Sequence, residues 1–141
     1  MNNEEKSCDI SRKYNPILNV NKLACLNNYF RREILTLQNL QITVMSIPSG
    51  GEIGLEIHND LDQLLFVEYG LASVYTGKTK NSVEFKGCAN DNCVIVIPAC
   101  TYHNVINEQH YPLKLVSVYA PPKHPVGTIH KTKFESDLED Y

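Results

Sequence analysis

No stretch of this 141-residue sequence comes near the roughly 18 consecutive apolar residues that a membrane-spanning helix requires. The first residues, 1–13, are polar and charged, and they lack the apolar segment and small-residue cleavage site of a secretion signal. Basic residues are also few, since 13 lysines and arginines stand against 16 acidic residues and are scattered along the chain. These absences predict a soluble, cytoplasmic protein that binds neither a membrane nor nucleic acid.

The cysteines lack the pattern of a disulfide framework or of a typical zinc site. There are five of them, an odd number, and no CxxC pair occurs. A cytosolic chain keeps such cysteines reduced. A metal site made by Cys88, Cys93 and Cys100 is the sharper alternative, but without a CxxC pair we interpret the cysteines mainly as small buried side chains.

Short apolar segments, rich in β-branched and aromatic residues, alternate with turn-forming residues from Leu40 onward. No helical pattern of ten or more residues separates them, which disfavours a parallel βαβ sheet. Many short strands at close spacing favour an antiparallel sandwich or barrel, so we predict an all-β fold. The predicted strands are residues 40–47, 54–58, 64–69, 72–75, 94–97 and 113–120.

The composition changes on both sides of this segment, which predicts three parts. Residues 1–39 form an N-terminal arm that is irregular apart from a short helix near residues 21–29, and residues 40–120 form the barrel. Residues 121–141 begin with two prolines and end in acidic residues, which predicts an extended C-terminal tail. His124 and His130 could enter a site if this tail folds over the barrel, although a mobile tail is the more common case.

Two potential metal ligands, Glu56 and His58, lie two residues apart in a predicted strand. Side chains at that spacing point to the same face, so these two project together. Gly54 faces the same way and, without a side chain, leaves space beside them. Gln63 follows a polar turn, and His103 lies well downstream. Judged singly, neither carries much weight, because a lone His near a strand end is usually structural and Gln is an unusual ligand.

The spacing of these residues resembles the two sequence motifs of the cupin family. The first family motif runs Gly, five residues, His-x-His, three or four residues, Glu, six residues, Gly. The second runs Gly, five residues, Pro-x-Gly, two residues, His, three residues, Asn. Here the corresponding patterns are Gly50-x5-Glu56-x-His58-x4-Gln63-x6-Gly70 and Asn92-x5-Pro98-x4-His103-x3-Asn107. The departures are the changed residues at two ligand positions, with Asn92 and Cys100 where the family has glycines.

The resemblance implies an antiparallel double-stranded β-helix, the cupin jelly-roll barrel, with one metal ion held inside by Glu56, His58, Gln63 and His103. Glu56 replaces a family His and Gln63 replaces a family Glu, but each still offers an oxygen donor. Two imidazoles and two oxygens suit a divalent Mn, Fe, Ni, Co or Zn ion, and an octahedral ion would keep positions open for a substrate. The alternative is a metal-free cupin in which Gln63 hydrogen-bonds within a polar core.

The cupin fold hosts many activities, so the function has to be predicted from the site. The site suits a metal-dependent dioxygenase or isomerase acting on a small oxygenated metabolite or sugar, with Glu56 and Tyr119 as candidate catalytic residues. The chain resembles small cupins labelled mannose-6-phosphate isomerase-like, but the barrel strands supply one basic residue, Lys114, which we predict to point to solvent. The alternative function is a non-catalytic, metal-dependent small-ligand-binding or sensor protein.

Val116 and Val118 give the predicted barrel an apolar outer surface that needs a cover. A homodimer formed through this face is the economical explanation, and covering by the N-terminal arm is the alternative.

Overall fold

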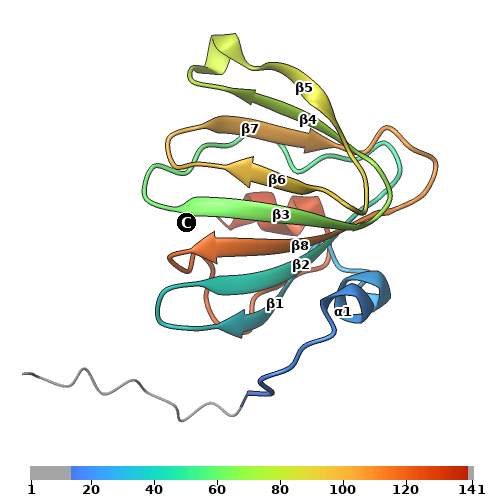
Figure 1. Ribbon diagram of the computed structural model, residues 1–141, viewed down its shortest axis with the longest axis vertical. Coiled ribbons are helices and arrows are strands. Elements are labelled where there is room, and N and C mark those ends of the chain that lie inside the picture. Colours follow the sequence, from blue (N-terminus) through green and yellow to red (C-terminus); the bar gives the residue numbers. More distant parts are fainter. Residues whose placement is uncertain (1–13, 140–141) are drawn as a thin grey trace, which may run out of the picture.

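The computed structural model describes residues 14–139, which form two antiparallel sheets and two short helices (Figure 1). The larger sheet has the strand order β6-β3-β8-β2-β1-β9, and the smaller has the order β5-β4-β7. This architecture confirms the all-β prediction. The elements are α1 (Val20–Leu26), β1 (Arg31–Thr36), β2 (Gln41–Ile47), β3 (Asp62–Tyr69), β4 (Ala72–Gly77), a 3₁₀ turn (Lys80–Ser82), β5 (Glu84–Ala89), β6 (Val94–Ile97), β7 (Tyr102–Ile106), β8 (Leu113–Ala120), β9 (Ile129–His130) and α2 (Lys133–Leu138).

The main apolar core consists of buried side chains from both sheets, together with Phe30 before β1 and Ile53 in the connection to β3. Along β2, β3 and β8, inward side chains alternate with outward ones, as the period of a strand requires. The core members are Phe30, Met45, Ile47, Ile53, Leu65, Val67, Ala72, Ala89, Ile95, Ile97, Val105, Leu113 and Leu115.

The register of these three strands divides the inner face of the large sheet into a polar end and an apolar end. At the polar end, Tyr119 of β8 lies between its partners Gln41 on β2 and Gln63 on β3. In the next inward row, Ser117 lies between Thr43 and Leu65. The two rows beyond it are wholly apolar and contain Met45, Leu115, Val67, Ile47 and Leu113.

Helix α1 covers part of the outer face of the large sheet, where its buried Ala24 packs with Val44 and Val116. The N-terminal arm therefore supplies the cover that we considered for Val116. Lys114 does not point to solvent as predicted, because the same helical segment buries it. Its ammonium donates to the carbonyl of Asn27 and, at 3.0 Å, to Ser46 Oγ, and burial lowers its pKa.

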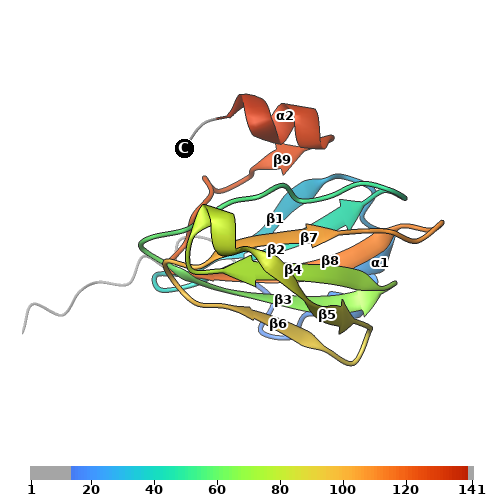
Figure 2. The same cartoon turned by 90° about the horizontal axis from the view of Figure 1, so that it is seen from above.

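The large sheet extends beyond the predicted barrel limits of residues 40–120 on both sides. β1 pairs with β2, and β9, from the predicted tail, pairs with β1. The tail is thus not extended throughout, since β9 and α2 lie together on one side of the barrel (Figure 2). Glu33 in β1 is buried and accepts a hydrogen bond from the Gly127 backbone N–H at 3.1 Å.

The predicted strand at residues 54–58 is wrong, because this segment makes only the isolated bridge Glu56↔His103. Gly54 has φ +103°, a backbone conformation that ordinary strand residues avoid. A side chain at Gly54 would also meet the stem of Lys133, which occupies the space predicted to be open beside the ligands. β5 and β7 are strands that sequence periodicity missed. Cys25, Cys88 and Cys100 are exposed, so the interpretation of the cysteines as buried is wrong for these three.

Neither helix in the described part of the chain has the length and apolar character that crossing a membrane would need.

Candidate metal centre

Glu56, His58 and His103 come together with their donor atoms within 4.8 Å of one another. Glu56 Oε1 lies 3.2 Å from His103 Nε2 and 3.4 Å from His58 Nε2. Two atoms that bind the same ion at about 2.1 Å lie about 3.0 Å apart at a right angle and about 3.4 Å apart at the tetrahedral angle. The two measured separations therefore suit ligands of a single divalent ion.

Backbone hydrogen bonds between the segment around Glu56 and strand β7 bring these side chains together. Glu56 and His103 exchange both backbone hydrogen bonds, at 3.0 and 2.9 Å. The Cys100 N–H donates to the His58 carbonyl at 2.7 Å, which ties the third residue to the turn before β7. Cys100 has φ +62°, so the position where the cupin motif has a glycine keeps the left-handed backbone without one. The sequence spacing thus identified the correct residues although the strand assignment failed.

The hydrogen bond of His103 Nδ1 orients the imidazole so that Nε2 faces Glu56. His103 Nδ1 lies 2.9 Å from the carbonyl oxygen of Thr101, which can only accept, so Nδ1 carries the proton. In a neutral imidazole, Nε2 then presents its lone pair toward the carboxylate oxygen of Glu56. Two lone pairs at 3.2 Å repel, so this contact needs either a second proton on the His103 ring, which makes Nε2 a donor, or a metal ion between the two atoms.

Electrostatics keeps Glu56 in the form that binds metal. Burial raises the pKa of Glu56, but the imidazoles of His103 and His58, at 3.2 and 3.4 Å from its carboxylate oxygen, lower it further, so the net pKa is well below its usual range. The carboxylate is therefore ionised at neutral pH. An anionic oxygen beside two imidazoles is a ligand set that Mn, Fe, Co, Ni and Zn all accept.

Gln63 lies at the same end of the barrel, but within residues 14–139 no hydrogen bond joins its side chain to the other three residues. It is 2% exposed, and its Nε2 donates to Ser117 Oγ at 2.9 Å. This bond leaves the amide oxygen Oε1 buried without a hydrogen-bond partner among the described residues. A buried carbonyl oxygen in that state loses its hydration without compensation, so it suits a role as a metal ligand.

Tyr119 faces inward as predicted and meets two histidines. Its ring lies edge-on to that of His58, with centroids 6.2 Å apart, and to that of His124, at 5.2 Å. His124 is buried, and this burial, aided by the charges of Arg31, Lys123 and His130, lowers its pKa to about 3. His124 and His130 are thus part of the structure at this end of the barrel, which corrects the expectation of a mobile tail.

A cavity of about 280 Å³ adjoins the candidate ligands. Apart from residues 56–58, the residues that line this cavity come from the predicted arm and tail, and the sequence analysis did not connect them with the site. Arg31 belongs to β1, and the tail residues lie about a hundred positions later, so no local spacing connects them. Tyr119 does not line the cavity. The lining residues are Arg31, Glu56, Ile57, His58, Lys123, His124, Ser136, Asp137 and Glu139.

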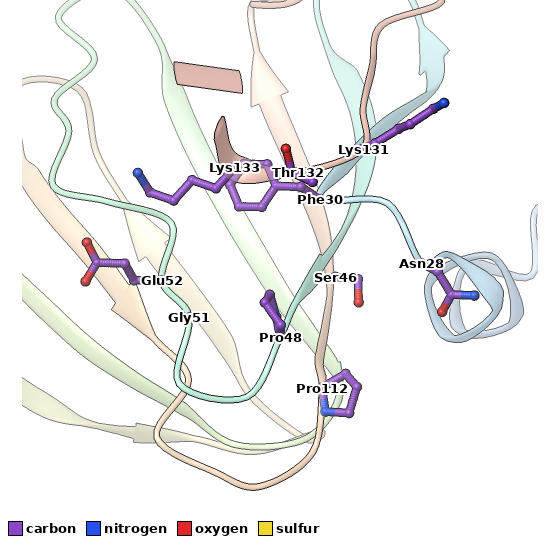
Figure 3. Close-up of a pocket in the computed structure, with 10 residues that line it drawn as sticks. All are labelled: Asn28, Phe30, Ser46, Pro48, Gly51, Glu52, Pro112, Lys131, Thr132 and Lys133. Carbon is purple, nitrogen blue, oxygen red and sulfur yellow. The ribbon is translucent and has the colours of Figure 1, made fainter. Parts of the chain in front are cut away.

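A second cavity, of about 410 Å³, lies on the other side of the tail segment and contains none of the predicted ligands. Its lining includes the apolar side chains Phe30, Pro48 and Pro112, and Figure 3 shows Lys131 and Lys133 extending to opposite sides of Phe30. Glu52 is its single carboxylate, so a metal site is not expected there.

Comparisons with known proteins match the fold, and the chain spans about two thirds of the length of the curated relatives that it matches. No family model matches. YrkC of Bacillus subtilis (strain 168), an uncharacterized protein, is 46% identical over 120 residues, which cover 85% of this chain and 64% of YrkC. The crystal structure of BH2720 from Bacillus halodurans is 42% identical with a TM-score of 0.87 and covers 94% of this chain and 98% of that one.

The fold is also similar to that of an RmlC-like cupin from Shewanella frigidimarina, with a TM-score of 0.56 at 15% identity over 67% of this chain and 77% of that one. This likeness supports the jelly-roll barrel that the sequence motifs predicted, with two antiparallel sheets enclosing a site near one end. The chain belongs to the family of BH2720 and is, by its fold, a small cupin.

Proposed function

We propose that this cupin is a metal-dependent enzyme, of the dioxygenase or isomerase class, that acts on a small oxygenated metabolite. One divalent ion is held by Glu56, His58 and His103, with Gln63 Oε1 as a fourth ligand. The observation that carries this proposal is the convergence of Glu56, His58 and His103, whose donor atoms lie within 4.8 Å of one another with both histidines buried. Two imidazoles and one carboxylate at these separations form a ligand set for a divalent ion.

The adjoining cavity gives this centre access to a ligand. Glu56 and His58 both line it, so a small molecule in the cavity would touch the metal ligands directly. A divalent ion there supplies Lewis-acid polarisation of a ligand oxygen. Glu56 carries the negative charge of the ligand set. Its lowered pKa makes it a poor general base, so we favour the ligand role over the catalytic one for this residue.

We assign Tyr119 a positioning role. It is 1% exposed and lies outside the cavity wall, and its ring packs against the ring of His58. Its hydroxyl lies 3.4 Å from His124 Nε2, so Tyr119 links His58 to the buried histidine of the tail. Such packing holds the imidazole of His58 in the orientation that faces Glu56.

Metal analysis of the native protein, followed by oxygen-uptake and sugar-isomerisation screens, tests the proposal. We expect one divalent ion per chain, and we expect both metal and turnover to be lost in His103→Ala and reduced in Gln63→Ala. His110, which is exposed, provides the matched control as His110→Ala. A protein without metal whose properties are unchanged in the two site variants contradicts the proposal. Full metal occupancy without turnover would favour a metal-dependent binding or sensor protein.

We further propose that the chain forms a homodimer through the outer face of β3 and β6. This face carries Phe66, Val94 and Val96, which are 38%, 44% and 60% exposed, and the register places Phe66 beside Val94. An apolar patch on an edge strand is typical of a surface that another chain covers. Val96→Glu is expected to convert the dimer to a monomer in sedimentation experiments, whereas Val126→Glu, on the exposed tail, leaves its mass unchanged. A monomeric native protein contradicts this proposal.

A further inference from the structure

Arg31 is a buried cation whose guanidinium is only partly satisfied. It is 4% exposed, lies on β1 and stacks over the ring of Phe30 at 5.2 Å. Its hydrogen bonds to described residues both use Nη1, which lies 3.0 Å from His130 Nδ1 and 2.6 Å from Ser136 Oγ. Nε is buried and has no hydrogen-bond partner within residues 14–139. No hydrogen bond from Nη2 to a described residue is formed either, so the guanidinium edge of Nε and Nη2 has no protein partner within residues 14–139.

No described carboxylate forms an ion pair with Arg31. The acids of the cavity wall have other partners, since Glu139 pairs with His130 at 2.7 Å, Asp137 with Lys133 at 2.6 Å, and Glu56 with His103 at 3.2 Å. The two hydrogen bonds and the stacking on Phe30 satisfy Arg31 only in part, because no described anion offsets its buried charge. Arg31 lines the same cavity as Glu56 and His58, so this charge lies beside the candidate ligands.

We propose that Arg31 binds the carboxylate of a small acid whose other oxygen atoms face Glu56 and His58. This inference rests on the proposed function and names its substrate class. The Nε and Nη2 edge of a guanidinium forms a planar pair of donors that matches the two oxygens of a carboxylate. Lys123, in the same wall, adds positive charge to the cavity.

The size of the cavity limits the acid. About 280 Å³ holds roughly nine water molecules at about 30 Å³ each, so the ligand has few atoms beyond its carboxylate and its metal-facing oxygens. A hydroxy or oxo acid of two to four carbons fits this description. Arg31 thus supplies the basic group that the barrel strands were expected to lack, and it does so from β1.

Glycolate and glycolamide provide matched probes, because they differ mainly in charge. With Zn²⁺-loaded protein titrated in NMR experiments, we expect glycolate to bind about tenfold or more tightly than glycolamide. Arg31→Gln is expected to remove most of this preference. Arg31→Lys, which keeps the positive charge but loses the planar pair of donors, is expected to retain part of it. Lys123→Gln is the control and is expected to reduce the preference less. An unchanged preference in Arg31→Gln overturns the inference.

Two further measurements separate this inference from the metal centre itself. Zn²⁺ affinity is expected to be unchanged in Arg31→Gln. A wild-type protein that binds no Zn²⁺ contradicts the proposed function, and the glycolate and glycolamide titrations of the metal-free protein and of its Arg31→Gln variant then test the role of Arg31. The wild-type Arg31 Nε–H resonance is expected to shift with glycolate and not with glycolamide, which needs no variant to fold. A resonance that glycolate leaves unmoved overturns the role of Arg31.

Discussion

The two ends of the barrel interior are built on the same three strands but have opposite chemistry. Along β8, the inward residues Tyr119 and Ser117 are followed by Leu115 and Leu113. β2 changes in the same place, from Gln41 and Thr43 to Met45 and Ile47. One end therefore has the side chains of a stable core, and the other has polar side chains that a fold alone does not require.

This difference indicates a division of labour within one small domain. The apolar rows bury surface from water, which is the main favourable contribution to folding. The polar rows contain buried groups with no partner among the described residues, such as Gln63 Oε1 and Thr43 Oγ1, and these reduce stability. Proteins keep such groups where function needs them, and the polar row contacts the candidate site through Tyr119, whose ring packs against that of His58.

The largest expected effect comes from truncating a side chain at the apolar end. Leu115→Ala leaves a cavity in a fully buried row and is expected to lower the free energy of unfolding by about 2–5 kcal/mol in urea denaturation. Ser117→Ala, two residues away at the polar end, removes one acceptor and is expected to cost less than about 1.5 kcal/mol. Equal losses in the two variants would break the comparison between the ends.

The second prediction is that Gln63, at the polar end, lowers the stability of the metal-free protein but contributes to metal binding. Gln63→Leu removes the unpartnered amide oxygen, so the metal-free protein should unfold at an equal or higher urea concentration. Its affinity for Zn²⁺ should fall by about 10–100-fold, because a ligand is lost. Gln63→Glu, which restores a carboxylate, is the control and should bind Zn²⁺ at least as tightly as the native protein. Unaltered Zn²⁺ affinity in Gln63→Leu would remove Gln63 from the ligand set.

The smallest effect concerns pH and the buried histidine of the tail. Burial lowers the pKa of His124 to about 3. Between pH 6.5 and 3, His124 is therefore protonated in the unfolded chain and neutral in the folded chain. His124 therefore reduces stability as the pH falls through this range, by about 1.4 kcal/mol per pH unit. Denaturation of His124→Asn between pH 7 and 5 should show a shallower decline than the native protein. Parallel curves would mean that His124 titrates normally.

The candidate metal ligands could be predicted from sequence because they follow spacings that resemble the cupin motifs even where the residue type differs. Glu56 and Gln63 differ from the family residues but keep oxygen donors, and the spacing led to both of them and to His103. The reason for their proximity was nevertheless misjudged, since Gly54 with its positive φ prevents a strand. Pairing between Glu56 and His103, rather than strand alternation, brings the ligands together.

The surroundings of the site could not be predicted, because they depend on contacts between the two ends of the chain. Arg31 and His130 are 99 residues apart, yet they share a hydrogen bond beside the cavity. Residues 1–39 were predicted to be an arm that is irregular apart from a short helix, and only the packing of β9 and α2 against β1 explains the burial of Arg31. Lys114 was misplaced for the same reason, since helix α1 and the residues after it cover its strand.

Crystals of the protein soaked with Zn²⁺ and measured at the zinc absorption edge test the central claim most directly. We predict a single strong anomalous peak about 2.0–2.2 Å from Nε2 of His58, Nε2 of His103 and a carboxylate oxygen of Glu56, with Gln63 Oε1 turned toward it. The absence of a peak between these residues in fully soaked crystals, or a peak held by other side chains, would contradict the account.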